Sequence, residues 1–155
     1  MNLFTRGLEW LSFFVPSHSG FLVIQNPPTP VNPMTKKVYL IEDDKRNMKL
    51  FMAILKLIPE CEVFTETRGN AGLELITQGE PDLVILDIQL PGMSGIEICR
   101  ELKAKPKFKD VPFIAVTSFA MKGDKKRILE AGFDEYLSKP IQVAKFRDLV
   151  RQYVE

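Results

Sequence analysis

The stretch Leu83-Val-Ile-Leu-Asp87-Ile-Gln-Leu-Pro91-Gly-Met-Ser-Gly95 decides how this chain folds. Four apolar residues lead to one carboxylate, and a proline and two glycines then force the backbone to turn. We therefore expect Asp87 at the mouth of a sheet and not in its core. An aspartate at that point can be a nucleophile, a metal ligand or only a turn residue, and the rest of the sequence favours the first two together.

Short apolar blocks alternate with helical patterns from residue 36 to the end of the chain. The predicted strands are residues 38–41, 61–65, 83–86, 113–116 and 136–137, and the predicted helices are residues 46–58, 71–78, 96–103, 124–131 and 143–154. This alternation predicts an α/β fold, a doubly wound parallel sheet of five strands with helices on both faces. The third and fourth strands are continuously apolar, as expected of central strands.

The composition indicates one soluble globular domain, because 45% of the 155 residues are hydrophobic and 26% are charged. A formal net charge of +1 gives no electrostatic footprint for nucleic acid or an anionic membrane. Cys61 and Cys99 fit no metal-site spacing and indicate a reduced, cytoplasmic protein. The single histidine, His18, is distant in sequence from every other candidate residue, so any histidine chemistry has to come from another protein.

Residues 1–33 differ from the rest of the chain, with five prolines and two short apolar runs at 8–15 and 21–24. Neither run approaches the ~18 residues that span a bilayer. We expect a disordered or wrongly assigned leader, with Met34 as the working start and residues 34–155 as the domain. A short interfacial helix at residues 8–15 is the alternative.

The first predicted helix is apolar over a wide arc, which consists of two rows: Met48, Phe51 and Leu55, and Leu50, Ile54 and Leu57. We expect both rows to be buried. The alternative is that the edge at Leu50 stays exposed as a docking ridge beside the site.

Polar side chains gather where the predicted strands end: Glu42, Asp43, Asp87, Thr117 and Lys139. Any one of them alone could be a helix cap, a turn residue or a surface residue. All five, however, fall at the carboxyl ends of strands, which is the edge where open α/β sheets bind ligands. The sequence therefore predicts a single polar site at this edge.

Three carboxylates that meet at one edge repel one another, so such a cluster needs a cation to persist. Mg²⁺ suits a site with oxygen ligands and several waters, and Lys139 supplies a second positive charge. A metal, a lysine, an exposed aspartate and a hydroxyl together indicate phosphoryl transfer to Asp87. In this scheme Thr117 donates to the phosphoryl group, and the product is an acyl phosphate.

From about residue 36 to residue 155 the chain resembles the receiver domain of two-component response regulators. The resemblance rests on Ile41-Glu-Asp43, Leu86-Asp-Ile-Gln-Leu-Pro-Gly-Met-Ser-Gly95, Ala115-Val-Thr-Ser118 and Tyr136-Leu-Ser-Lys-Pro140. Asn47-Met-Lys-Leu-Phe51 and Phe119-Ala-Met-Lys-Gly-Asp124 are most similar to the single-domain DivK type, although the receivers of hybrid kinases share similar runs.

The resemblance implies a flavodoxin- and CheY-like sheet with strand order 2-1-3-4-5 and a cis peptide between Lys139 and Pro140. It implies Asp87 as the phosphoacceptor. Mg²⁺ is then expected on Asp43, Asp87 and the backbone carbonyl of Gln89, with Glu42 acting through water. Glu42 stands where an aspartate is commoner in the family.

The resemblance also implies Thr117 and Tyr136 as a switch pair that remodels the face of the fourth helix, fifth strand and fifth helix. A histidine kinase or histidine phosphotransferase is then the upstream partner and another protein the downstream effector, with the chain a monomer or a weak phosphorylation-dependent dimer. A relay intermediate for a hybrid kinase is an alternative output. Phe119 is expected to shield the phosphoryl group, which predicts a long-lived phosphorylated form.

The residues at the site also argue against two other function classes. Phosphatases of the haloacid dehalogenase type need a second aspartate two residues after the nucleophile, and Gln89 at that position cannot supply a proton. An inert receiver-like binding module is expected to lack Asp87, Lys139 or the acidic pair, and this chain has them all. We therefore expect a phosphoacceptor signalling protein and not a true enzyme.

Overall fold

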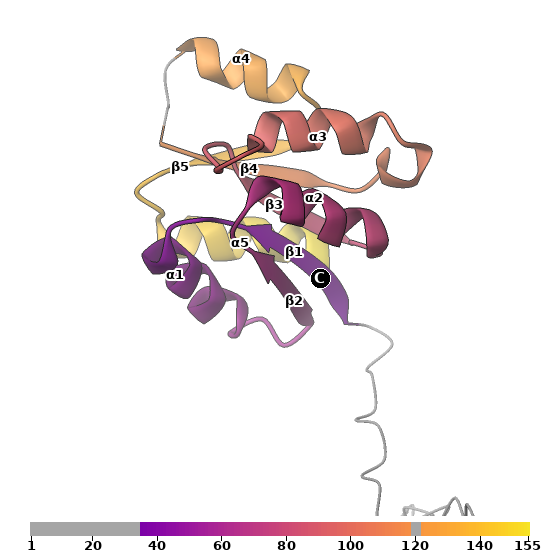
Figure 1. Ribbon diagram of the computed structural model, residues 1–155. Helices are drawn as coiled ribbons and strands as arrows, with labels where there is room; N and C mark the ends of the chain where they lie inside the picture. Colours follow the sequence, from indigo (N-terminus) through magenta and orange to yellow (C-terminus); the bar gives the residue numbers. More distant parts are fainter. Residues whose placement is uncertain (1–34, 119–121) are drawn as a thin grey trace, which may run out of the picture. The chain divides into compact units, whose positions relative to one another are not determined.

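The computed structural model describes residues 35–118 and 122–155 (Figure 1). The sequence predictions on the leader, His18 and Phe119 lie outside these residues. The strands are β1 (Lys36–Ile41), β2 (Cys61–Glu66), β3 (Leu83–Asp87), β4 (Phe113–Thr117) and β5 (Glu135–Ser138). The helices are α1 (Lys45–Leu55), α2 (Gly69–Gln78), α3 (Gly95–Lys103), the 3₁₀ turn η1 (Pro106–Phe108), α4 (Lys122–Glu130) and α5 (Val143–Val154).

The strands form one parallel sheet in the order β2-β1-β3-β4-β5, which confirms the predicted topology. Helices α1 and α5 cover one face of this sheet, and α2, α3 and α4 cover the other (Figure 1). All residues of β3 and β4 are buried, because both strands lie inside the sheet with helices on either side. The sheet order places the ends of β1, β3 and β4 side by side at one edge.

Helix α1 is shorter than predicted and ends at Leu55. Leu57 and Ile58 donate backbone hydrogen bonds to Ile54 and Leu55, three residues back, so the last turn tightens before Pro59. The prediction that both apolar rows are buried was therefore wrong at Leu57. This residue lies past the end of the helix, and it is 66% exposed. Leu50 is half-buried against the α1–α5 core, so the edge is not a fully exposed ridge either.

The turn after Asp87 leads into α3 through a reciprocal cap. Ser94 accepts a hydrogen bond from the backbone N–H of Glu97, and the Glu97 carboxylate accepts from the backbone N–H of Ser94. Gly95, the first residue of α3, passes so close to the backbone carbonyl of Asp87 that an added Cβ would overlap it. The helix start therefore packs directly against the backbone of the candidate acceptor.

Gly95→Ala is expected to lower the free energy of unfolding by about 2–3 kcal/mol, because the new methyl group has to displace backbone atoms. Urea unfolding followed by circular dichroism measures the change. Ser94→Ala is the comparison, since it removes the cap without adding atoms and is expected to cost about 1 kcal/mol. If both variants lost the same small amount of unfolding free energy, the close approach of Gly95 to the backbone of Asp87 would be contradicted.

Within residues 35–118 and 122–155, none of the helices combines the length and the apolar character needed to cross a membrane.

Candidate phosphoryl-transfer site

The polar residues predicted from the strand ends meet at one edge of the sheet. Glu42 follows β1, Asp87 ends β3 and Thr117 ends β4. The register pairs Ile41 with Leu86 and Asp87 with Val116, so these ends are level with one another. Glu42, Asp87 and Thr117 are 0%, 2% and 1% exposed, and in the described part of the chain they are the only buried polar or charged residues.

Lys139 brings a positive charge to this edge from the loop after β5. Its Nζ donates to Asp87 Oδ2 at 2.6 Å and to Glu42 Oε1 at 3.0 Å. The side chain is only 15% exposed, so both ion pairs are largely shielded from water and strengthened. The peptide bond between Lys139 and Pro140 is cis, as the sequence resemblance implied.

Glu42 is held by three donors on one oxygen. Its Oε1 accepts from Lys139 and from the Asn47 side-chain amide and the Asp44 backbone N–H, both at 3.2 Å. The second oxygen, Oε2, is buried and lies 3.0 Å from the Lys139 ammonium, but it accepts no well-directed hydrogen bond from the described residues. Burying an acceptor with unused lone pairs lowers the stability of the folded state, and it is unusual in proteins. A bound cation would remove this cost.

Three carboxylates at this edge fit a divalent cation. Glu42, Asp43 and Asp87 each offer an oxygen within 4.8 Å of the others, with Asp43 exposed to solvent. Hard oxygen donors, one solvent-facing ligand and a Glu42 Oε2 that accepts no directed hydrogen bond suit Mg²⁺, which keeps several waters. The backbone N–H of Gln89 donates to Asp87 Oδ1 at 2.9 Å, which fixes the orientation of that carboxylate.

The predicted switch residues lie on neighbouring strands. Tyr136 of β5 pairs with Ala115 of β4, two residues before Thr117. The ring of Tyr136 is half-buried, and the Nζ of Lys125 in α4 lies 5.7 Å from its centroid. A cleft of about 170 Å³ opens beside Thr117, and its lining combines three isoleucines with polar and charged side chains: Ile88, Ile96, Ile128, Gln89, Asp124 and Arg127.

A family model for the response regulator receiver domain matches residues 38–151. The chain belongs to this family. The receiver is similar to the polar-differentiation response regulator DivK of Brucella ovis, with 42% identity over 124 residues that cover 78% of this chain and 98% of DivK. DivK of Brucella anthropi is 40% identical over 121 residues, again 78% of this chain and 98% of the relative.

Solved receiver structures have the same fold. The receiver domain of the sensor histidine kinase PA1611 from Pseudomonas aeruginosa has a magnesium ion coordinated in its active-site cleft; it is 27% identical, with a TM-score of 0.70 over 77% of this chain and 98% of its own. The BeF3-activated receiver domain of Klebsiella pneumoniae RstA is 31% identical, with a TM-score of 0.69 and the same coverage.

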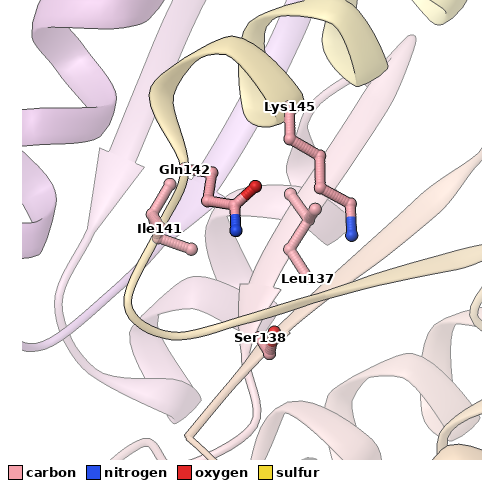
Figure 2. A pocket seen from close by; sticks show the side chains of 5 residues that line it. All are labelled: Leu137, Ser138, Ile141, Gln142 and Lys145. Atoms are coloured by element: carbon pink, nitrogen blue, oxygen red, sulfur yellow. The ribbon is translucent and has the colours of Figure 1, made fainter.

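A second hollow of this receiver lies at the start of α5 and not at the acidic edge. Figure 2 shows its lining side chains: Leu137, Ser138, Ile141, Gln142 and Lys145. Its volume of about 20 Å³ is enough for a single water. This hollow is therefore too small to hold a phosphoryl group or any larger ligand.

Electrostatics at the acidic edge disfavour the charged form of Glu42. Burial is the main cause that raises its pKa, the Asp87 charge adds to it, and hydrogen bonds from Lys139 and Asn47 oppose it. Burial also lowers the pKa of Lys139, but its hydrogen bonds to Asp87 and Glu42 outweigh this and raise that pKa above its ordinary value. Lys139 therefore stays charged and offsets only part of the negative charge around it.

The raised pKa of Glu42 predicts a pH-dependent effect of Glu42→Gln. Above the ordinary value of 4.5, folded Glu42 binds its proton more tightly than the unfolded chain does, so the contribution of Glu42 to stability falls as pH rises through this window. Glutamine carries no charge and lacks this loss. With chelator present, urea unfolding from pH 4 to pH 7 is expected to show Glu42→Gln gaining stability relative to wild type as pH rises. If the difference in unfolding free energy between Glu42→Gln and wild type stayed constant with pH, the raised pKa of Glu42 would be contradicted.

Asn47 is the site residue that sequence reasoning missed. It appeared only as part of the run that resembles DivK, without a role. A polar amide in the first turn of α1, five residues after Glu42, was the available signal.

Proposed function

We propose that this receiver is a single-domain response regulator that accepts a phosphoryl group on Asp87 in a Mg²⁺-dependent reaction. The observation that carries the proposal is the Lys139 ammonium at 2.6 Å from Asp87 Oδ2, inside a cluster of three carboxylates. The DivK relatives support the single-domain assignment, because this chain aligns with 98% of their length.

The donor is a phosphohistidine on a partner kinase or phosphotransferase, since residues 35–118 and 122–155 contain no histidine. An Asp87 carboxylate oxygen attacks the phosphorus, so a P–O bond forms while the P–N bond breaks. The electron pair of the broken bond goes to the imidazole nitrogen, which takes a proton from water. The products are an aspartyl phosphate on the receiver and a neutral histidine on the partner.

Several side chains around Asp87 stabilise the phosphoryl group during its transfer, each in a different way. Lys139 balances negative charge on the phosphoryl oxygens, and the Thr117 hydroxyl donates to one of them. Asp43, Asp87 and the backbone carbonyl of Gln89 would hold Mg²⁺, with Glu42 acting through water. When bound, Mg²⁺ neutralises charge on the phosphoryl oxygens and on the acids.

The output is a population shift in the face formed by α4, β5 and α5. The Thr117 hydroxyl moves toward the phosphoryl group, and the Tyr136 ring then turns inward beside it. The cleft next to Thr117 supports this proposal, because Tyr136 is not part of its lining. A protein effector in the cytoplasm reads the altered face, and the chain acts as a monomer or a weak phosphorylation-dependent dimer.

The receiver domain on this proposal spans residues 34–155, and residues 1–33 are a leader. The family match over residues 38–151 supports the position of the domain. Intact-mass analysis of the native protein tests the start, and a mass that includes residue 1 would contradict a working start at Met34.

Incubation with acetyl phosphate tests the proposed reaction without a partner. In the presence of Mg²⁺, intact mass spectrometry is expected to show one added phosphoryl group, which peptide mapping places on Asp87. Excess chelator is expected to prevent the addition. Continuous release of inorganic phosphate at an enzymatic rate would favour a phosphatase instead, and no addition at all would favour an inert binding module.

A further inference from the structure

Asn47 makes a contact that its position in α1 does not require. The N-cap of this helix is Asp44, whose Oδ1 already accepts from the backbone N–H groups of Arg46 and Asn47. Asparagine has a lower helix propensity than alanine, so helix propensity does not explain this side chain. Its Nδ2 instead donates to Glu42 Oε1 at 3.2 Å, the same oxygen that accepts from the backbone N–H of Asp44.

This hydrogen bond acts on a side chain with more freedom than an aspartate would have. Glu42 has one methylene and one torsion more than aspartate, so a buried carboxylate at this position needs restraint. The Asn47 amide and the Asp44 backbone N–H both hold Oε1, which sets the rotation of the carboxylate plane. The other oxygen, Oε2, is buried 3.0 Å from the Lys139 ammonium but accepts no directed hydrogen bond, and it lies in the cluster with Asp43 and Asp87.

We infer that Asn47 is a positioning residue, which holds Glu42 Oε1 so that Oε2 stays available to the hydrated cation. The inference rests on the proposed function, because it assigns a role toward the Mg²⁺ that the acids hold. Asn47 itself binds neither the cation nor the phosphoryl group. Its effect passes through Glu42 alone, which separates it from a residue that merely stabilises α1.

Isothermal titration calorimetry with MgCl₂ tests this inference, because it measures metal affinity without phosphorylation. Asn47→Ala is expected to weaken Mg²⁺ binding about three- to tenfold, since one hydrogen bond that orients a metal-site acid is lost. Asn70→Ala is the matched control. It makes the same change in the first turn of α2, at an exposed position, and is expected to leave the affinity unchanged.

A double-mutant cycle separates positioning from a structural role. In a Glu42→Ala background the side chain that Asn47 restrains is absent, so adding Asn47→Ala is expected to have no further effect on Mg²⁺ affinity. The same several-fold loss in both backgrounds would overturn the inference, as would an Asn47→Ala protein that binds Mg²⁺ like wild type. Asn47→Ser, whose hydroxyl is too short for the same contact, is expected to behave like Asn47→Ala and guards against a folding defect of one variant.

The outcomes also distinguish this inference from the proposed function. Wild-type protein that binds Mg²⁺ and accepts phosphate on Asp87, but shows no coupling between Asn47 and Glu42, would leave the proposed function standing and remove the positioning role. Wild-type protein that binds no Mg²⁺ in the titration would overturn both.

Discussion

Asp87→Asn is expected to take up no phosphoryl group from acetyl phosphate or from a phosphorylated histidine donor. The change replaces the carboxylate that we propose as the nucleophile with an uncharged amide of the same shape. The variant still accepts the hydrogen bond that Gln89 N–H donates to Oδ1 of Asp87, so the turn is kept. Intact mass spectrometry after incubation with donor and Mg²⁺ measures the uptake, and circular dichroism checks that the fold is unchanged.

Stability offers an independent check on this variant. Asp87→Asn removes one of two carboxylates that share the Lys139 ammonium, so in chelator the folded state is expected to be as stable as wild type or more so. Residual phosphorylation in Asp87→Asn, mapped to Thr117 or any other residue, would show that Asp87 is not the sole acceptor. Equal uptake in variant and wild type would remove Asp87 from the mechanism.

Lys139→Met is expected to lower both the stability and the phosphorylation rate. It leaves two buried carboxylates, on Glu42 and Asp87, without their ammonium partner. Removing one partner of a buried ion pair costs about 3–5 kcal/mol. The loss is expected to shrink at low pH, because the orphaned carboxyl groups then bind protons. Phosphorylation by acetyl phosphate is expected to slow by about two orders of magnitude, as when one stabilising donor of a transition state is removed.

The control for Lys139→Met is Lys105→Met. Lys105 is 40% exposed and pairs with Glu101 one helical turn earlier, so its removal is expected to change stability by less than about 1 kcal/mol. Saturating Mg²⁺ is expected to restore part of the stability of Lys139→Met, since the cation offsets the same two acids. If the two lysine substitutions changed stability by similar amounts, or if Mg²⁺ did not stabilise Lys139→Met, the proposed role of Lys139 as the partner of both acids would be contradicted.

Much of the site could be predicted because its parts lie at strand ends. The apolar run before Asp87 and the one before Thr117 identify buried parallel strands, and parallel strands present their carboxyl ends at one edge. Helix ends were less predictable. The 3₁₀ turn Pro106–Phe108 has no periodicity long enough to detect, and α1 stops at Leu55 although the apolar pattern continues to Ile58.

The sequence by itself determined the alternation of strands and helices, the strand order through the family motifs, and which acids and which lysine reach the site. The alternation follows from local periodicity, and the place of the site residues follows from the geometry common to all parallel sheets, whereas the strand order was implied only by the family resemblance. Only the tertiary structure decided how the charges pair. Lys139 contacts residues 52 and 97 positions away, and it spans Asp87 and Glu42 at once. The restraint of Glu42 by Asn47 likewise depends on how α1 leaves the sheet, and spacing along the chain does not encode that angle.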